Sequence, residues 1–493
     1  MLHIAEDCLQ IIINELQYDL SSLYSCILVN RYWCRIAIPI LWKNPSSLKG
    51  FSPSKLYNMI IFLLPKSSKK FLSDNIPEFS LTEITYDKLL FNYISFFTQI
   101  SPDLISSISQ SLVNSKGYND EKWIAEKYEK YVLEQEFYEL FINNCKSLKL
   151  FYWNTSHPLF KYQGATTCFS QLCTLIINLM FLTIANLFDM TQICQNIKHL
   201  EVIECKGNII VGLVNFIEIQ RNLQSLPIDF FHEERSDIFE FIPLSSIIMK
   251  KASTLKKFII RPFIGLLSPK ILTSLINLQH LELINDMDFN MLFEGYTVEA
   301  WDEYLSITSF PNLEYLKIHD YYLPSFIKDY MLIEKSNGNI LEINILKMKV
   351  HDPIYTKKLI ITISKCCPKI KRLTIINIEP ENFEDLKEIF LNCTQLEMLG
   401  PLLDSKEHNG DKLFEIISDH SPETLCEYSF NLIFTIEGLE KFFENWKKRK
   451  SPHILNIIKL RYNGSFTEHD KIIKKYFDEG VIKEYNYHNF RSF

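Results

Sequence analysis

A short apolar pattern that recurs at nearly regular spacing constrains the fold of this chain more than any other feature. The pattern is apolar-x-x-apolar-x-apolar, as in "LQHLEL" from Leu278, and successive copies begin 23 to 35 residues apart. Clear copies begin at Leu148, Leu172, Ile197, Leu223, Leu255, Leu278, Leu313, Ile340 and Ile370, and weaker copies begin at Leu396, Leu425 and Leu455. A period of this length indicates a repeat architecture, in which each unit stacks on the next and shares its core.

Each repeat predicts a strand followed by a returning helix. The last two apolar positions alternate with period two, which is the spacing of one face of a strand. The residues that follow are numerous enough for a turn and a helix that packs back on the strand. We therefore predict an α/β solenoid of about twelve irregular repeats over residues 145–493. Positions one, four and six of each repeat should be buried, for example Leu278, Leu281, Leu283, Leu313, Leu316 and Ile318.

The pattern and its spacing resemble those of leucine-rich repeats, which form α/β horseshoes. Such repeats usually carry Asn or Cys three residues after the last apolar position. In this chain only Cys205 fits, which favours an irregular, helix-rich variant. Several copies have a cysteine three residues before the first position, and we expect these to be core thiols beside the turn: Cys145, Cys194, Cys367 and Cys393.

Residues 1–45 predict three short helices. An i, i+3, i+4, i+7 apolar stripe over residues 6–16 indicates an amphipathic helix. Asp19 stands where the N-cap of a second helix belongs. A third helix should begin near Trp33, and Pro39 should end or kink it. A module of this size cannot hide two tryptophans and many aliphatic side chains from water unaided, so part of its surface must meet something else.

This N-terminal segment resembles an F-box. The Leu-x-x-Cys-x-x-Val-Asn-Arg-x-Trp core of that motif is present as Leu23, Cys26, Val29, Asn30, Arg31 and Trp33. Ala5 stands where the family usually has Pro, and Ile4 where it often has Leu. With the repeats included, the whole chain resembles the fungal family of F-box proteins with C-terminal leucine-rich repeats.

The resemblance implies the substrate-recognition subunit of a Skp–cullin–F-box ubiquitin ligase. The F-box would dock on a Skp-family adaptor, and through it on the cullin, by helix-in-groove contacts. The repeats would bind an unknown protein substrate, and partner subunits would transfer ubiquitin, so this chain would not be an enzyme. The expected adaptor-binding residues are Leu9, Ile12, Ile13, Leu16, Leu23, Val29, Trp33 and Trp42. Burial inside the module is the alternative for the two tryptophans, and a leucine-rich-repeat scaffold without a ligase role is the alternative function.

Residues 46–144 are expected to form a helical linker region between the F-box and the repeats. Pro, Ser and Lys cluster in "NPSSLKGFSPSK" and "LPKSSKK", which is typical of connecting loops. In contrast, "DEKWIAEKYEKYVLEQEFYELFINNC" places Trp123, Tyr128 and Tyr131 at helical spacing. This segment predicts one long helix.

Positions three and five of each repeat should face away from the core, because side chains alternate across a strand. In a solenoid these positions line up from repeat to repeat on the inner, concave surface. The central repeats place charged, Tyr and His side chains there, which suits a protein partner. The expected substrate-binding residues are Lys257, Arg261, His280, Glu282, Tyr315, Lys317, His319, Glu342 and Arg372. An ordinary solvated sheet face is the alternative, as is binding at the C-terminal end or at the inserted loops.

Composition narrows the class of protein further. A net charge of -7 gives no basic field for nucleic acid or for an anionic membrane. "MLHIAEDC" does not match a signal peptide, and 12 Cys without one indicate reduced thiols in a cytoplasmic or nuclear protein. The stretch 162–188 carries no charge and approaches a membrane span. Because Gln171, Asn178 and Asn186 interrupt it, a buried strand and helix are the expected interpretation.

No motif of catalysis or metal binding stands out. "HEERS" (His232–Ser236) lacks the second His of a zinc-protease helix, and the chain has no Cys-x-x-Cys, Gly-rich phosphate loop or Gly-x-Ser-x-Gly elbow. We therefore predict no catalytic residue, no metal and no cofactor. The basic run "NWKKRK" (Asn445–Lys450) is either a nuclear or nucleic-acid signal or, as we favour, a solvated helix end.

Overall fold

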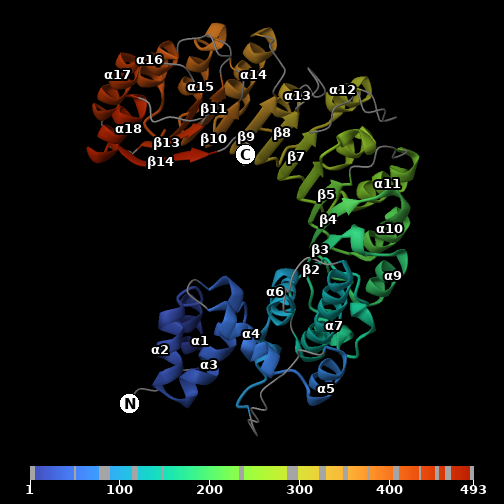
Figure 1. The fold of residues 1–493 in the computed structure, drawn as a ribbon. Coiled ribbons are helices and arrows are strands. Elements are labelled where there is room, and N and C mark those ends of the chain that lie inside the picture. Colours follow the sequence, from blue (N-terminus) through green and yellow to red (C-terminus); the bar gives the residue numbers. More distant parts are fainter. Residues whose placement is uncertain are drawn as a thin grey trace. The chain divides into compact units, whose positions relative to one another are not determined.

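A computed structural model describes most of the chain (Figure 1). The described residues are 6–48, 52–76, 89–113, 120–146, 148–231, 238–285, 298–320, 329–347, 353–375, 378, 380–403, 410–431, 435–449, 455–460 and 468–488. Ile4, Ala5 and the segment His232–Ser236 lie outside these ranges. The chain divides into two compact units, Met1–Cys205 with Val211–Leu223, and Lys206–Ile210 with Gln224–Phe493.

The first unit begins with helices and ends with a parallel sheet. Its strands are β1 (Gln99–Ile100), β2 (Leu150–Trp153), β3 (Thr174–Asn178) and β4 (His199–Cys205), and each is parallel to the next. Its helices are α1 (Glu6–Glu15), α2 (Leu20–Val29), α3 (Arg31–Leu41), η1 (Pro45–Ser47), α4 (Pro53–Phe62), α5 (Lys66–Asn75), η2 (Tyr93–Phe96), α6 (Pro102–Leu112), α7 (Asp120–Asn144), η3 (Leu159–Lys161), α8 (Ala165–Phe169), η4 (Leu179–Phe181), α9 (Ile184–Ile193) and, from Val211 onward, α10 (Ile210–Ile219).

Side-chain caps explain where the first helices begin. Asp19 Oδ1 accepts hydrogen bonds from the backbone N–H groups of Ser21 and Ser22, at 3.0 and 3.2 Å, which confirms the predicted N-cap of α2. Asn30 caps α3 in the same way. Of the two effects expected of Pro39, ending the helix is not seen: α3 continues to Leu41, and the Trp42 N–H still donates to the Ile38 carbonyl and completes the last turn.

The stretch "LPKSSKK" is helical rather than a connecting loop, so that expectation was wrong. Pro53 opens α4 and Pro65 immediately precedes α5. Proline is well tolerated at a helix start, because the N–H that it lacks would have no intrahelical partner there. Leu72 is fully buried, so α5 has an apolar anchor despite its many Ser and Lys residues. Further along the linker region, the long helix predicted from "DEKWIAEKYEKYVLEQEFYELFINNC" is confirmed as α7.

The second unit continues the repeat. Its strands are β5 (Ser225–Phe230), β6 (Lys257–Arg261), β7 (His280–Asn285), β8 (Tyr315–Asp320), β9 (Glu342–Lys347), β10 (Arg372–Ile375), β11 (Met398–Leu403), β12 (Glu427–Asn431), β13 (Leu455–Leu460) and β14 (Ile482–His488). Its helices are η5 (Gly207–Ile209), η6 (Ile238–Phe241), α11 (Ile242–Lys251), η7 (Ile264–Leu266), η8 (Pro269–Ser274), α12 (Val298–Ile307), α13 (Asp329–Glu334), α14 (Pro353–Cys366), η9 (Pro380–Asn382), α15 (Leu386–Asn392), α16 (Asp411–His420), α17 (Ile436–Lys447) and α18 (Glu468–Asp478).

These strands are parallel and follow one another in chain order, with the helices on one face of the sheet (Figure 1). Every repeat copy that the sequence predicted, from Leu148 to Leu455, coincides with one strand, β2 to β13. The α/β solenoid prediction is therefore confirmed. The sequence analysis missed β1 and β14. The β1 segment has Pro102 in the sixth position of the motif, whereas the β14 segment, "IKEYNY", fits the motif only with Tyr485 and Tyr487 in the fourth and sixth positions.

The predicted core positions are buried. Leu278, Leu281, Leu283, Leu313, Leu316 and Ile318 are all at most 1% exposed. The four cysteines expected beside the turns are buried as well, and burial raises the pKa of Cys393 to about 12. Such thiols are protonated at neutral pH and act as small apolar groups. Stretch 162–188 folds as α8, β3, η4 and part of α9, and none of the helices in the described part of the chain is both long and apolar enough to cross a membrane.

Candidate functional site

The three N-terminal helices expose large apolar side chains. Leu28 and Val29, at the end of α2, are 84% and 56% exposed, and Ile11 and Ile12 on α1 are 63% and 50% exposed. Tyr24 precedes Leu28 by one helical turn, so both lie on the same face of α2. A monomeric soluble protein rarely gathers this much exposed apolar surface on so short a segment, and such surfaces usually bind partners.

The residues predicted to bind an adaptor fall into three groups. Ile12 and Val29 are exposed, and Leu16 and Trp33 are half-buried. The others are buried inside the unit, where they hold the helices together: Leu9, Ile13, Leu23 and Trp42.

Trp42 fixes the end of α3 to the rest of the first unit. Its ring centroid lies 4.9 Å from that of Tyr93 and 6.0 Å from that of Phe97. Phe97 in turn meets Phe141 of α7 edge-on, with 4.9 Å between centroids. Trp42 therefore belongs to an aromatic core that joins α3, η2 and α7.

The second candidate surface is the face of strands β6–β12 opposite the helices, which we call the central strand face. The register aligns Lys257, His280, Tyr315, Glu342 and Arg372 in one row across five neighbouring strands. All five side chains are partly exposed. Since neighbouring strands are about 4.8 Å apart, side chains in such a row touch each other.

A second row begins two residues further along and contains Glu282 and Lys317. The His280 ring stacks on Tyr315, with 4.0 Å between centroids, and its Nε2 lies 2.5 Å from Glu282 Oε1. Burial would raise the pKa of Glu282, but the hydrogen bond with His280 and the charges of His280, Lys317 and Lys257 outweigh it. The pKa of Glu282 is therefore lowered, and this carboxyl is ionised at neutral pH.

Arg372 ties three strands together. Its guanidinium lies 3.8 Å from Glu342 on β9 and donates to Glu427 on β12 at 3.3 Å. Burial, with the nearby carboxylates of Glu282 and Glu342, raises the pKa of Tyr315 well above its ordinary value, so its hydroxyl stays protonated. The face thus combines fixed charges with a neutral phenol, a set that can pair with polar groups of a protein.

Arg261 and His319 lie one row further along their strands. Arg261 is 3.4 Å from Asp229 on β5. His319 is partly exposed and is aligned with Ile284 and Leu346, both buried. The structure therefore brings seven of the nine predicted residues into two adjacent rows and leaves these two at the margin.

Two residues that contact the predicted set were missed: Glu427 on β12, within the central strand face, and Asp229 on the neighbouring strand β5. Glu427 occupies position three of the repeat that begins at Leu425, so the register used for the central repeats would have found it. Asp229 follows position six of the repeat at Leu223, in the place that Arg261 has in the next repeat.

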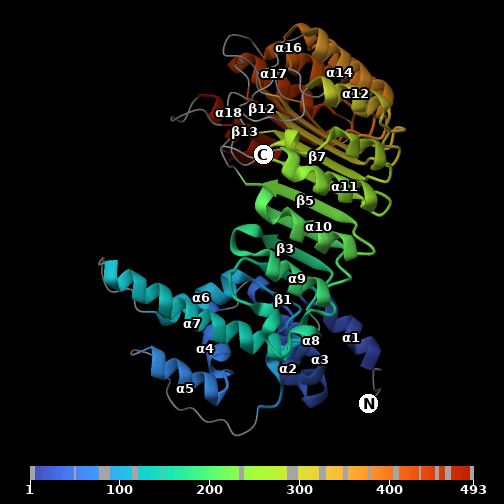
Figure 2. The same ribbon diagram turned by 90° about the vertical axis from the view of Figure 1, so that its right-hand side faces the viewer.

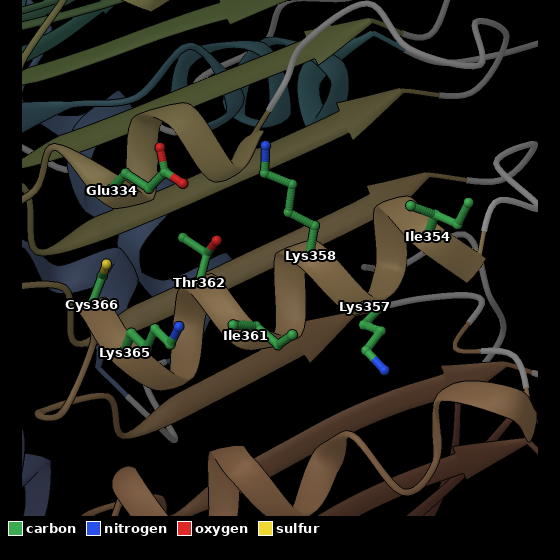
Figure 3. Close-up of a pocket in the computed structure, with 8 residues that line it drawn as sticks. All are labelled: Glu334, Ile354, Lys357, Lys358, Ile361, Thr362, Lys365 and Cys366. Carbon is green, nitrogen blue, oxygen red and sulfur yellow. The ribbon is translucent and has the colours of Figure 1, made fainter.

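A pocket of about 390 Å³ lies on the helical side of the same unit, between α13 and α14 (Figure 3). Its lysines already have partners: Lys357 is 3.3 Å from Asp385, and Lys358 lies 3.8 Å from the centroid of the Tyr330 ring. Burial and the charge of Glu334 raise the pKa of Cys366, which also lines the pocket. The pocket therefore offers no reactive thiolate.

Two further sequence features can be placed. The basic run near the end of α17 is engaged within its unit, since Lys447 pairs with Glu444 and Glu479, and Arg449 donates to the Ser421 carbonyl. This arrangement fits a helix end better than a nucleic-acid patch. Within the described ranges, no three His, Cys, Asp or Glu side chains gather so that they could hold a metal ion.

No family model matches the chain, and neither does any curated protein. Among solved structures, a chain of the yeast Rad7–Elc1 complex aligns with a TM-score of 0.37 and 14% identity, over 72% of this chain and 97% of that chain. A protein from Bacteroides fragilis aligns with a TM-score of 0.37 and 13% identity, over 60% of this chain and 76% of that chain. These similarities are distant, so what the chain does has to be argued from its own residues.

Proposed function

We propose that this chain is the substrate-recognition subunit of a Skp–cullin–F-box ubiquitin ligase. The observation that carries the proposal is the exposed apolar surface on α1 and α2, in a segment whose sequence has the F-box core from Leu23 to Trp33. In this role the chain holds two proteins at once and leaves ubiquitin transfer to partner subunits.

The adaptor contact would be made by the exposed members of the N-terminal helices. Ile12, Leu28 and Val29 would enter an apolar groove of a Skp-family adaptor, with Leu16 and Trp33 at the margin. The buried members would act indirectly, by keeping the three helices in the geometry that presents those side chains. A few such aliphatic anchors can carry most of the binding energy of an interface.

The substrate contact would be made by the central strand face. Its ion pairs are partly exposed, so a partner can exchange them for its own charges without first unfolding any element. Fixed charges of both signs around Tyr315 would favour a protein surface with a matching charge pattern. Such a complex would operate in the cytoplasm or the nucleus.

The first test is binding to a Skp-family adaptor. The double variant Leu28→Asp/Val29→Asp should abolish co-purification of the full chain with the adaptor, because it puts two carboxylates into an apolar contact. The matched control is Ile354→Asp/Leu391→Asp, which changes two equally exposed apolar residues on the helical side of the second unit. Both variants should keep the thermal unfolding midpoint of the wild type.

Two results would contradict the ligase role. One is an absence of adaptor binding by the wild type, which the alternative of a repeat scaffold without ligase function predicts. The other is undiminished binding by the double variant, which would move the contact away from α2.

The second test concerns the substrate. The triple variant Lys257→Gln/Lys317→Gln/Arg372→Gln should lose proteins captured by the wild-type chain while adaptor binding persists. Its control neutralises three ion-paired lysines among the helices, Lys357→Gln/Lys412→Gln/Lys441→Gln. Capture that survives the first triple variant would place the substrate elsewhere.

A further inference from the structure

The charges of the central strand face are distributed unevenly from strand to strand, and the proposed function makes no use of their order. Helices such as α11 and α14 pack on the other side of the sheet (Figure 2), so the described elements of the second unit leave this face open to a partner. The strand register gives the position of each charge along the face.

Positive charge prevails on β6, β7 and β8. Lys257 on β6 and Lys317 on β8 flank Glu282 on β7, and both ammonium charges act on that one carboxylate. At the margin, Arg261 on β6 is matched by Asp229 on β5. With histidine counted as neutral, two ammonium groups therefore share a single carboxylate, which leaves this side with an excess of positive charge.

Negative charge prevails on β9 to β12. The guanidinium of Arg372 on β10 lies 3.8 Å from the carboxylate of Glu342 on β9 and donates to Glu427 on β12 at 3.3 Å. The strand between them, β11, has the uncharged Met398 in the same row. Here two carboxylates share one guanidinium, so this side is the counterpart of the first with the signs exchanged.

Aromatic rings separate the two sides in the first row. The stacked rings of His280 and Tyr315 lie between Lys257 and Glu342. The positive side is centred on β7, and the negative side is centred midway between β9 and β12. At about 4.8 Å per strand these two centres are about 17 Å apart, which an extended peptide covers with about five residues.

We propose that the substrate of the central strand face is an extended protein segment that carries acidic and basic residues in two separate groups, about five residues apart. The acidic group pairs with Lys257 and Lys317, and the basic group pairs with Glu342 and Glu427. Opposite charges at the two ends fix the position of the segment across the strands, whereas a segment of one sign meets like charges at one end. A nucleic acid fits poorly, because its uniform negative charge would face both glutamates.

This inference rests on the proposed function, because it names the class of substrate that the receptor takes. Two synthetic peptides of equal composition test it with the purified full chain. In the first, an Asp pair and an Arg pair stand at opposite ends, with about five Gly and Ser residues between them. In the second, each end carries one Asp and one Arg. Fluorescence anisotropy should show about 10-fold tighter binding of the first peptide, because only that peptide matches both sides of the face.

Two double variants assign the ends. Lys257→Gln/Lys317→Gln removes the positive excess, and Glu342→Gln/Glu427→Gln removes the negative excess. Each should lower the affinity for the first peptide about 10-fold and so remove the preference. If a double variant fails to keep the thermal unfolding midpoint of the wild type, the single variants Lys317→Gln and Glu427→Gln test the same ends.

The matched controls remove the same charges among the helices of the second unit. Lys412→Gln/Lys441→Gln neutralises two lysines, and Glu384→Gln/Glu415→Gln neutralises the two glutamates with which they pair. Both controls should keep the preference for the first peptide, because these residues lie away from the central strand face.

Three results would overturn the proposal. They are equal affinity of the wild type for the two peptides, a preference that survives both strand variants, and binding of an all-Asp peptide as tight as that of the first peptide. Adaptor co-purification on the same preparations reports the ligase role separately. A chain that binds the adaptor without distinguishing the peptides contradicts this inference alone, whereas one that distinguishes the peptides without binding the adaptor contradicts the ligase role.

Discussion

Helices α1–α3 and strands β6–β12 differ in how completely their apolar side chains are buried. In the strands, each core position is covered by the next repeat, as Leu281 and Leu316 show at 0% exposure, and the opposite face holds polar groups that pair with each other. In the helices, Leu9 and Leu23 are buried but Leu28 remains 84% exposed. A stacked repeat completes its core with its own neighbours, whereas three short helices cannot bury all of their apolar side chains among themselves.

The polar surfaces of the two regions differ as well. The central strand face links residues that are far apart in sequence, as Arg372 and Glu427 show, which are 55 positions apart. The polar contacts of α2 and α3 are local, since Asp19 and Asn30 each cap the helix that follows. We therefore expect substitutions in the strands to affect the cooperative core, and those in the helices to affect binding or a single helix.

The largest predicted effect tests the covered core against the exposed helix surface. Leu316→Ala should lower the free energy of unfolding by about 2–5 kcal/mol, because it leaves a cavity between repeats. Leu28→Ala should change it by less than about 0.5 kcal/mol. Urea unfolding followed by circular dichroism measures both. Similar losses in the two variants would remove the distinction between the regions.

A buried polar residue extends the comparison to the repeats of the first unit. Gln220 is fully buried; its Oε1 accepts from the Ile197 N–H at 2.9 Å and its Nε2 donates to the Cys194 carbonyl at 2.8 Å. Gln220→Ala would leave those backbone groups unpaired, so it should cost about 1–3 kcal/mol of unfolding free energy. Gln192→Ala, at an exposed site on α9, is the control. Equal stability of the two variants would contradict a stabilising role for the hydrogen bonds of Gln220.

A cap substitution tests whether the N-terminal helices open independently of the strands. Asn30 Oδ1 accepts from the N–H groups of Tyr32 and Trp33, both at 2.9 Å. Asn30→Ala should cost about 1 kcal/mol and Asn30→Asp much less, because the carboxylate also accepts. Hydrogen exchange should report faster opening of α3 in Asn30→Ala with β6–β12 unchanged. Faster exchange throughout the strands would show that the two regions are coupled.

The smallest predicted effect is a pH dependence on the central strand face. The pKa of Glu282 is lowered in the folded chain, so this group stabilises the fold above its ordinary pKa of 4.5, and that contribution is lost as pH falls through the folded value. Glu282→Gln should reduce stability at pH 7 by less than about 1 kcal/mol. The difference from the wild type should shrink in acid. A difference that stays constant from pH 7 to pH 3 would rule out the charge as its cause.

The sequence by itself determined the elements whose signals are local. Alternation with period two predicted strands and buried positions such as Leu278 and Leu313, because each repeat presents the same face to its neighbours. The N-cap at Asp19 and the long helix α7 followed from single residues and helical spacing. The inward and outward positions of the central strands were predictable for the same reason.

Tertiary structure alone decided what depends on contacts distant along the chain. Only the fold shows that Trp42 joins an aromatic core with Phe97 and Phe141, and that the Ser- and Lys-rich stretch at α5 is a helix with Leu72 buried. The pairing of Arg372 with Glu427 requires strands from different repeats. The apolar pattern of a sequence predicts which side chains tend to be buried, but not which neighbour covers each of them. The exposure of Leu28 could therefore be known only from the folded structure, in which all the contacts within the chain are present.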